Sequence, residues 1–148
     1  MLGLGRRRMT DPAPLDGVDV VLADLDGVVY RGDDAIPHAV ESLNRASEAA
    51  RIGYLTNNAS RTATSVAQHL SDLGLSVVAD DVVTSPQAAI VLLADLVEPG
   101  ATVLVVGGEG LTSVVEAAGF TVTRSATDAP AAVIQGFAPH VALSLIHI

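Results

Sequence analysis

One short stretch near the start constrains the fold of this 148-residue chain more than any other. The apolar run Val20–Ala23 ends in Asp24-Leu25-Asp26, and Gly27 follows at once. Side chains alternate along a strand, so we expect the two carboxylates on one side and Leu25 on the other. Open α/β sheets bind ligands at the carboxyl ends of their strands, and glycine permits a tight turn there. The stretch predicts a strand that ends in a ligand site, although an ordinary exit into a turn uses the same residue types.

Strand-like and helix-like segments alternate along the rest of the chain. The apolar spacing predicts strands at 18–23, 52–55, 102–106 and 132–135, and helices at 37–51, 61–73, 86–97 and 111–118. Prolines open two of these helices, and glycines follow the ends of others. Such alternation is typical of an α/β fold with a parallel sheet and crossover helices. We place a domain boundary near Ser85 and interpret residues 1–17 as a flexible leader, with Met1 or Met9 as the start.

Composition excludes several classes of function. The net charge of -9 and a pI near 4.6 argue against a nucleic-acid-binding or anionic membrane surface. No cysteine is present, which excludes a disulfide framework, a thiol nucleophile and a thiolate metal site. No apolar run approaches the ~20 residues of a membrane span. We expect a soluble cytoplasmic protein with neither nucleic-acid nor membrane partners.

A second polar group follows the next predicted strand. Thr56-Asn57-Asn58 comes directly after 52–55, and in a parallel sheet that end lies at the same edge as Asp24 and Asp26. Two acids beside neutral donors suggest a phosphate whose charge is neutralised by a metal. Mg²⁺ fits, because it takes one or two carboxylates together with phosphate oxygens. Thr56 and Asn57 are expected to hold the phosphoryl oxygens, although alone they would equally form an Asx-type turn.

Three motifs together resemble the haloacid dehalogenase (HAD) superfamily of phosphatases. They are Asp24–Val28, Thr56–Arg61 and Val83–Ser85, and the resemblance covers residues 18–139. The chain is most similar to the subgroup with a large α/β cap inserted after the second motif, which includes p-nitrophenyl, phosphoglycolate and glycerol-3-phosphate phosphatases. The resemblance implies a Rossmann-like parallel sheet at 18–85, the N-terminal part of the core, and the first half of the cap at 86–142.

The resemblance also implies a role for each motif residue. Asp24 would be the nucleophile that forms an aspartyl-phosphate, and Asp26 the general acid and then the general base. Both would contact Mg²⁺, Asp26 through its backbone carbonyl. Thr56, Asn57 and Gly27 would bind the phosphate of a small phosphorylated metabolite. Association into homo-oligomers through the cap stays open.

The chain departs from the family pattern after the cap begins. The family has a later lysine that stabilises the phosphoaspartate and a Gly-Asp segment that completes the Mg²⁺ site. This chain has no lysine, and Asp128 is its last acid. We interpret it as the first half of a catalytic site and expect the fragment to be inactive. A phosphoacceptor signalling domain and a non-catalytic regulatory fragment stay as alternatives.

Three further sequence features do not indicate a functional site. Residues 143–148 resemble the in-frame translation of a transposase adapter and are interpreted as adapter-derived, with a native apolar terminus as the alternative. Gly107–Gly110 lacks the spacing of a phosphate-binding loop and predicts a plain strand-to-helix turn. The histidines have no metal-ligand spacing and are interpreted as surface or incidental residues: His38, His69, His140 and His147.

Overall fold

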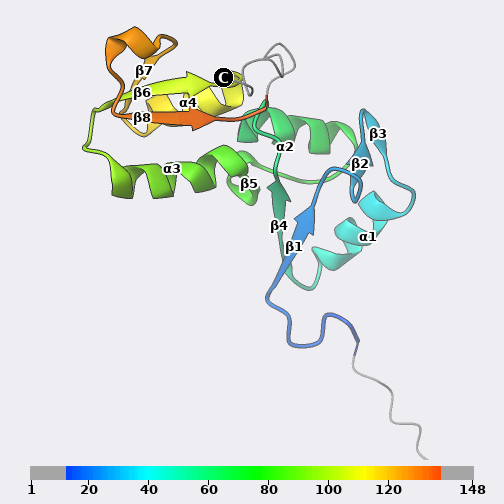
Figure 1. The fold of residues 1–148 in the computed structure, drawn as a ribbon. Helices are drawn as coiled ribbons and strands as arrows, with labels where there is room; N and C mark the ends of the chain where they lie inside the picture. The colour runs from blue at the N-terminus through cyan, green and yellow to red at the C-terminus, as the bar shows by residue number, and fades with distance from the viewer. Residues whose placement is uncertain (1–12, 138–148) are drawn as a thin grey trace, which may run out of the picture.

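The computed structural model describes residues 13–137, which form two small parallel sheets with their helices (Figure 1). Most of the predicted leader (1–12), the last residues of the predicted cap (138–142) and the tail at 143–148 lie outside the described residues. Within 13–137, no helix is both long enough and apolar enough to cross a membrane. The α/β class with parallel sheets, predicted from the sequence, is confirmed.

The first sheet has the order β1-β4-β5, and all of its strands are parallel. Helix α1 (Ala39–Ala46) links β1 (Val20–Asp24) to β4 (Arg51–Thr56), and α2 (Ala63–Asp72) links β4 to β5 (Val82–Thr84). Both connections step in the same direction across the sheet. Because such crossovers are right-handed, both helices lie on the same face.

That covered face holds the first hydrophobic core. Side chains from the strands, from α2 and from the loop after β1 are almost fully buried there, and α1 packs against them. The buried set comprises Ala23, Leu25, Val29, Tyr30, Ile52, Tyr54, Val66, Ala67, Leu70, Leu75 and Val82. Leu25 and Leu70 have no exposed surface. Burial of Leu25 therefore fixes the carboxyl end of β1 against the core.

The opposite face of the same sheet carries exposed apolar side chains. Val20 is 50% exposed, Leu22 64%, Leu55 36% and Val83 47%. We call these four residues the open face. Parallel sheets in α/β proteins are normally covered on both faces, so an apolar face that residues 13–137 leave exposed is unusual.

The second sheet has the order β7-β6-β8 and is also parallel. After β5, helix α3 (Ser85–Leu96) leads to β6 (Thr102–Val106), and α4 (Glu109–Ala117) connects β6 to β7 (Thr121–Thr123). A 3₁₀ turn, η2 (Ala126–Asp128), precedes β8 (Ala132–Gln135). A separate core joins α3, α4 and this sheet, and it comprises Leu93, Val103, Val105, Leu111, Val115 and Phe120. Two separate cores agree with a division near Ser85, which stays a prediction.

Two features near the first sheet differ from the sequence-based prediction. The helix predicted at 37–51 spans only Ala39–Ala46. His38 takes a left-handed backbone (φ 69°), which delays the start, and Arg51 donates its N–H to the Asp19 carbonyl, which makes it part of the sheet. A hairpin of β2 (Tyr30–Arg31) and β3 (Asp34–Ala35) was not predicted.

Short segments account for the other differences. For β5, of three residues, the sequence indicates only that Asp80-Asp81 begins a strand or caps a loop, and η1 (Ala79–Asp81) lies there. The three-residue strand β7 and the turn η2 were not predicted. Each is too short to show a hydrophobic period, so its pairing depends on neighbours that are distant in sequence.

Candidate active site

The two aspartates lie at the carboxyl end of β1, and both are exposed. Asp24 is the last residue of the strand, and its Oδ1 accepts a hydrogen bond from the Leu25 N–H at 2.9 Å. Leu25 turns into the core and has no exposed surface. Burial of Leu25 therefore holds the two flanking carboxylates toward solvent, as strand alternation predicts.

Gly27 makes the turn that follows. Its φ of +84° lies in the region that favours glycine, and its N–H donates to the Tyr30 carbonyl at 2.8 Å. An added Cβ would meet nothing within 4 Å, so the requirement for glycine here is conformational rather than steric. In this structure Gly27 shapes the loop after Asp26, while its own N–H is used within that loop.

Thr56 joins the end of β4 to Asp26. Its side chain is only 5% exposed, and Oγ1 donates to Asp26 Oδ2 at 3.2 Å. The same oxygen accepts the Asn58 N–H at 3.0 Å. The predicted meeting of the two motifs, 30 residues apart in sequence, is thus present as a direct side-chain contact.

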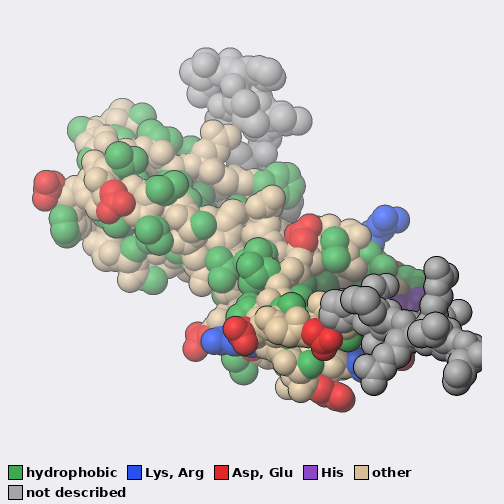
Figure 2. Space-filling model, turned by 90° about the horizontal axis from the view of Figure 1, so that it is seen from below, with side chains coloured by type: hydrophobic (Ala, Val, Ile, Leu, Met, Phe, Trp, Pro, Cys, Tyr) green, Lys and Arg blue, Asp and Glu red, His purple; other side chains and the backbone are tan. Residues whose placement is uncertain are grey.

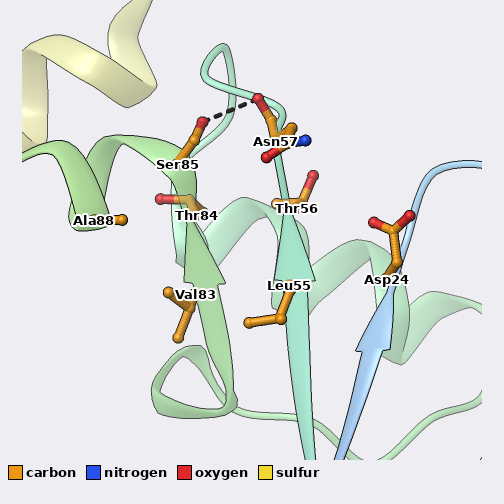
Figure 3. Close-up of a pocket in the computed structure, with 8 residues that line it drawn as sticks. All are labelled: Asp24, Leu55, Thr56, Asn57, Val83, Thr84, Ser85 and Ala88. Atoms are coloured by element: carbon orange, nitrogen blue, oxygen red, sulfur yellow. Dashed lines mark hydrogen bonds between the residues drawn. The ribbon is translucent and has the colours of Figure 1, made fainter.

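Asn57 is exposed at the same edge, and the first residue of α3, directly after β5, fixes its backbone. Ser85 Oγ donates to the Asn57 carbonyl at 2.9 Å (Figure 3). Ser85 is part of a motif that the sequence analysis names, but no role was predicted for it. Its position could have indicated one, because Thr84 and Ser85 place two hydroxyl groups at a strand end, as Thr56 does.

These strand ends surround a shallow pocket of about 360 Å³. Figure 3 shows the Asp24 carboxylate at the end of β1, with Leu55 and Val83 on the neighbouring strands. The lining residues are Asp24, Leu55, Thr56, Asn57, Val83, Thr84, Ser85 and Ala88. Asp26 and Gly27 lie outside this lining, on the side of the β2–β3 hairpin, where Gly27 borders a second pocket with Arg31.

Two aromatic rings, those of Tyr30 in the first core and of His69 on α2, pack against each other. Burial raises the pKa of the Tyr30 phenol, the nearby charge of Asp26 raises it further, and Arg61 partly opposes this. The Tyr30 ring meets the His69 ring edge-on, with centroids 4.7 Å apart. Within residues 13–137, the Nε2 atom of His69 is buried without a hydrogen-bond partner, although His69 as a whole is half-buried. The sequence predicts a surface or incidental histidine, and the structure places it against Tyr30 of the first core.

The donor set suits a hard cation but does not enclose one. Across residues 13–137, no group of three or more His, Cys, Asp or Glu side chains could hold a metal ion. Asp24 and Asp26 supply two exposed carboxylates, which is the number that Mg²⁺ commonly takes from a protein. The residues present therefore fit Mg²⁺ as a partial ligand set.

We call the first sheet with α1 and α2 the first unit, and the second sheet with α3 and α4 the second unit. The loop after Thr56 contacts the second unit at Gly110 of α4. A Cβ on Gly110 would lie 2.5 Å from the Arg61 carbonyl oxygen and 2.8 Å from the Ala59 carbonyl oxygen. Gly107–Gly110 forms the predicted strand-to-helix turn, between the end of β6 and the first residues of α4. Its glycine allows α4 to approach the backbone beside the candidate site.

The family follows from a sequence comparison over most of this region. The model for haloacid dehalogenase-like hydrolases matches residues 21–121, which include Asp24, Asp26, Thr56 and Asn57. The chain belongs to the haloacid dehalogenase-like hydrolase family. This confirms the resemblance inferred from the motifs.

Relatives of this haloacid dehalogenase-like chain are phosphatases by name. D-glycerol 3-phosphate phosphatase of Mycobacterium tuberculosis is 47% identical over 118 residues, which are 80% of this chain and 33% of the relative. Glycerol phosphate phosphatase from the same organism, solved in complex with magnesium, superposes with a TM-score of 0.76 at 43% identity, over 84% of this chain and 37% of that one. The p-nitrophenyl phosphatase of Archaeoglobus fulgidus superposes with a TM-score of 0.73 at 25% identity, over 87% and 48%. The chain thus spans about a third of the first of these relatives.

Proposed function

We propose that this chain carries the first part of the active site of a Mg²⁺-dependent phosphatase that acts on a small phosphorylated metabolite. The observation that carries the proposal is the contact between Thr56 Oγ1 and Asp26 Oδ2 beside the exposed Asp24. It joins the ends of two parallel strands into one polar edge. The names of the relatives support glycerol 3-phosphate as the first substrate to test.

The proposed reaction has two displacements at phosphorus. An Asp24 carboxylate oxygen attacks the phosphorus, the bond to the leaving alcohol breaks, and Asp26 gives its proton to that alcohol oxygen. Asp26, now a carboxylate, then takes a proton from water as the water oxygen attacks the phosphoaspartate. Inorganic phosphate leaves, and the Asp24 carboxylate is restored.

The other residues of the edge bind and position the phosphoryl group. Thr56 Oγ1 already receives the Asn58 N–H, so its hydroxyl proton is directed outward toward Asp26 and the phosphate position. The Asn57 amide is exposed beside it, with its backbone fixed by Ser85. Gly27 supplies the turn that directly follows Asp26, with its φ of +84°.

Mg²⁺ would be held by the Asp24 side chain and the Asp26 backbone carbonyl, together with ligands that residues 13–137 do not supply. When bound, it offsets the repulsion between a carboxylate nucleophile and a phosphate dianion. The magnesium in a structure of the Mycobacterium tuberculosis relative supports this choice of cation. Cytoplasmic location and homo-oligomerisation stay predictions.

A chimera tests the proposal. This chain replaces the matching third of the Mycobacterium tuberculosis D-glycerol 3-phosphate phosphatase, and phosphate release from glycerol 3-phosphate is measured with Mg²⁺ and with EDTA. We expect Mg²⁺-dependent turnover, and a loss on the order of 10³-fold or more in Asp24→Asn, because the nucleophile is removed. The matched control is Asp19→Asn, an exposed aspartate just before β1 that is expected to change turnover less than about twofold.

Other outcomes would favour the alternatives. Undiminished turnover or phosphoenzyme in Asp24→Asn would contradict the assignment of the nucleophile. Stable labelling by acetyl phosphate without turnover would favour a phosphoacceptor domain. No response to either Mg²⁺ or phosphate would favour a non-catalytic fragment.

A further inference from the structure

The loop after β4 is stabilised in part by its own side chains. We call residues 57–61 the phosphate loop, because they follow Thr56 and begin with Asn57. Thr56 Oγ1 accepts the Asn58 N–H, and Asn58 Oδ1 accepts the Ser60 N–H at 2.9 Å and the Ser60 hydroxyl at 2.6 Å. These bonds hold the loop from Asn58 onward, and none of them uses the Asn57 carbonyl. The position of Asn57 therefore depends on a contact from another element.

Ser85 supplies that contact at the point where the backbone pairing stops. The pairing of β4 with β5 ends at Thr56 and Thr84. The chain then enters α3, and Pro86 has no N–H to offer to the neighbouring strand. Ser85 Oγ donates to the Asn57 carbonyl at 2.9 Å, as the dashed line in Figure 3 shows. The hydroxyl thus extends the link between the two strand ends by one residue.

The start of α3 holds Ser85 in place. Thr84, 2% exposed, donates both its N–H (2.8 Å) and its hydroxyl (3.0 Å) to the Gln87 side-chain oxygen. Pro86 is fully buried, and its ring fixes the backbone angle φ. Because both neighbours of Ser85 are fixed, its hydroxyl reaches the Asn57 carbonyl at a small cost in conformational entropy.

Two glycines of the second unit contact the later part of the phosphate loop. A Cβ on Gly110 of α4 would lie 2.5 Å from the Arg61 carbonyl oxygen. A Cβ on Gly136, directly after β8, would lie 2.9 Å from the Ala59 Cβ. Together with Ser85 at the start of α3, the second unit therefore holds this loop at three positions.

The charge of the chain makes fixed neutral donors important for binding an anion. The net charge is -9, and Figure 2 shows acidic side chains (red) scattered over the face seen from below. Such a chain repels a phosphate dianion at long range. Binding then depends on neutral N–H and O–H groups that are held in position before the ligand arrives. The exposed amide of Asn57 is a donor of this kind.

We propose that Ser85 is a positioning residue for phosphate binding and that it acts through Asn57. It fixes the Asn57 backbone, so the amide of that side chain starts from one position in the pocket that both residues line. Gly110 and Gly136 hold the rest of the loop. The second unit thereby sets the geometry of the phosphate site in the first. This inference rests on the proposed function, because it gives Ser85 a task within that site.

Steady-state kinetics of the chimera test the inference. Ser85→Ala is expected to raise KM for glycerol 3-phosphate about fivefold and to change kcat less than about twofold, because Asn57 binds substrate and transition state alike. Ser85→Thr keeps the hydroxyl and is expected to restore KM to within about twofold of the wild-type value. In an Asn57→Ala background, Ser85→Ala is expected to add less than about twofold, since the amide through which it acts is absent.

Hydrogen exchange tests the same contact without turnover. Mass spectrometry of the 148-residue chain follows the backbone amides of the phosphate loop. We expect Ser85→Ala, but not Ser85→Thr, to speed exchange of the Asn58 and Ser60 N–H groups about fivefold or more, because the loop opens more often. Circular dichroism of each variant checks that the helices and strands remain.

Ser47→Ala is the matched control for both experiments. The Ser47 hydroxyl also donates to a backbone carbonyl, that of Asn44, at 2.8 Å. It lies before β4 begins, whereas Asn57 follows the end of that strand. Ser47→Ala is therefore expected to leave both KM and the exchange of the phosphate loop unchanged.

The possible outcomes separate this inference from the proposed function. An active chimera in which Ser85→Ala keeps the wild-type KM would overturn the inference and leave the function intact. The same rise in KM in Ser85→Thr, or an undiminished rise in the Asn57→Ala background, would overturn it too. A wild-type chimera without turnover would contradict the proposed function, and hydrogen exchange then decides. Faster exchange in Ser85→Ala would support the positioning of the loop, and unchanged exchange would exclude it.

Discussion

The two sheets share an architecture but differ at the carboxyl ends of their strands. In the first, Asp24, Thr56 and Ser85 surround a pocket. In the second, Arg124 closes the same end of β6, and its Nη1 donates to the carbonyls of Val105 at 2.7 Å and Gly107 at 3.0 Å. Its Nη2 donates to the Thr112 hydroxyl at 2.7 Å.

The difference supports the first sheet as the place of the proposed chemistry. Both units supply parallel strands that end beside a helix, which is the usual position of a ligand site in α/β proteins. The first edge holds exposed carboxylates and hydroxyl groups that line a pocket, whereas at the second edge the Arg124 guanidinium donates to the backbone carbonyls. The residues at the strand ends decide the function, because the fold alone does not.

The largest expected effects test whether the two cores are independent. Leu70 is fully buried in the first core, and Leu111, 2% exposed, is buried in the second. Replacing either with Ala is expected to cost about 3 kcal/mol of unfolding free energy in its own unit. Both tyrosines lie in the first core, so tyrosine fluorescence during urea unfolding reports that unit, while circular dichroism reports both.

We expect Leu70→Ala to shift the fluorescence transition and Leu111→Ala to leave it unchanged within about 0.5 kcal/mol. An equal shift in the two variants would mean that the units unfold as one. The comparison of the two sheets would then hold for chemistry but not for stability.

A smaller effect is expected where the units touch. Gly110→Ala places a methyl group against the Arg61 and Ala59 carbonyls, so backbone must move, at a cost of about 2 kcal/mol. Glu116→Ala, an exposed change on the same helix, is the control. Urea unfolding of the two variants measures the difference. If the Gly110→Ala protein is as stable as the control, the backbone at this contact can move without a measurable cost in stability.

Removal of the guanidinium tests the role of Arg124. Arg124→Ala is expected to cost about 1 kcal/mol, because the side chain is exposed and water can replace part of its hydrogen bonding. Arg124→Lys is expected to recover little, since one ammonium group cannot reproduce the planar fork. Thermal unfolding followed by circular dichroism measures both. Full stability in Arg124→Ala would show that the carbonyls at the end of β6 do not need the hydrogen bonds from Arg124.

The smallest expected effect is a pH dependence confined to the first unit. Burial raises the pKa of Tyr30 and of Tyr54 above the ordinary value of 10.0. The folded state then holds these protons more tightly, so its stability is complete below pH 10.0 and declines as the pH rises through the folded-state pKa values. The chain has no lysine or cysteine to titrate in this range.

Alkaline titration of tyrosinate absorbance checks this expectation. In Tyr30→Phe and Tyr54→Phe the decline in stability should be smaller than in the wild-type chain. Leu111→Ala serves as the control, because it changes the second unit alone and should leave the tyrosine titration in place. An unchanged decline in both Phe variants would contradict the assignment to tyrosines.

The polar edge was predictable from sequence because local rules determine it. Strand alternation separates Asp24 and Asp26 from Leu25, and the parallel arrangement brings Thr56 to the same end. The role of Ser85 was not predictable in this way, since its partner is a backbone carbonyl 28 residues away. The left-handed His38 was equally hidden, because no periodicity marks a single unusual backbone angle.

The open face also has a consequence for handling the isolated chain. Within residues 13–137, β1 is an edge strand beside an apolar sheet surface, which favours association of like molecules, and net charge opposes it. That charge is -9 at pH 7 and vanishes near the pI of 4.6. Mildly acidic buffers should therefore turn a dispersed solution into a precipitate while each molecule keeps its fold.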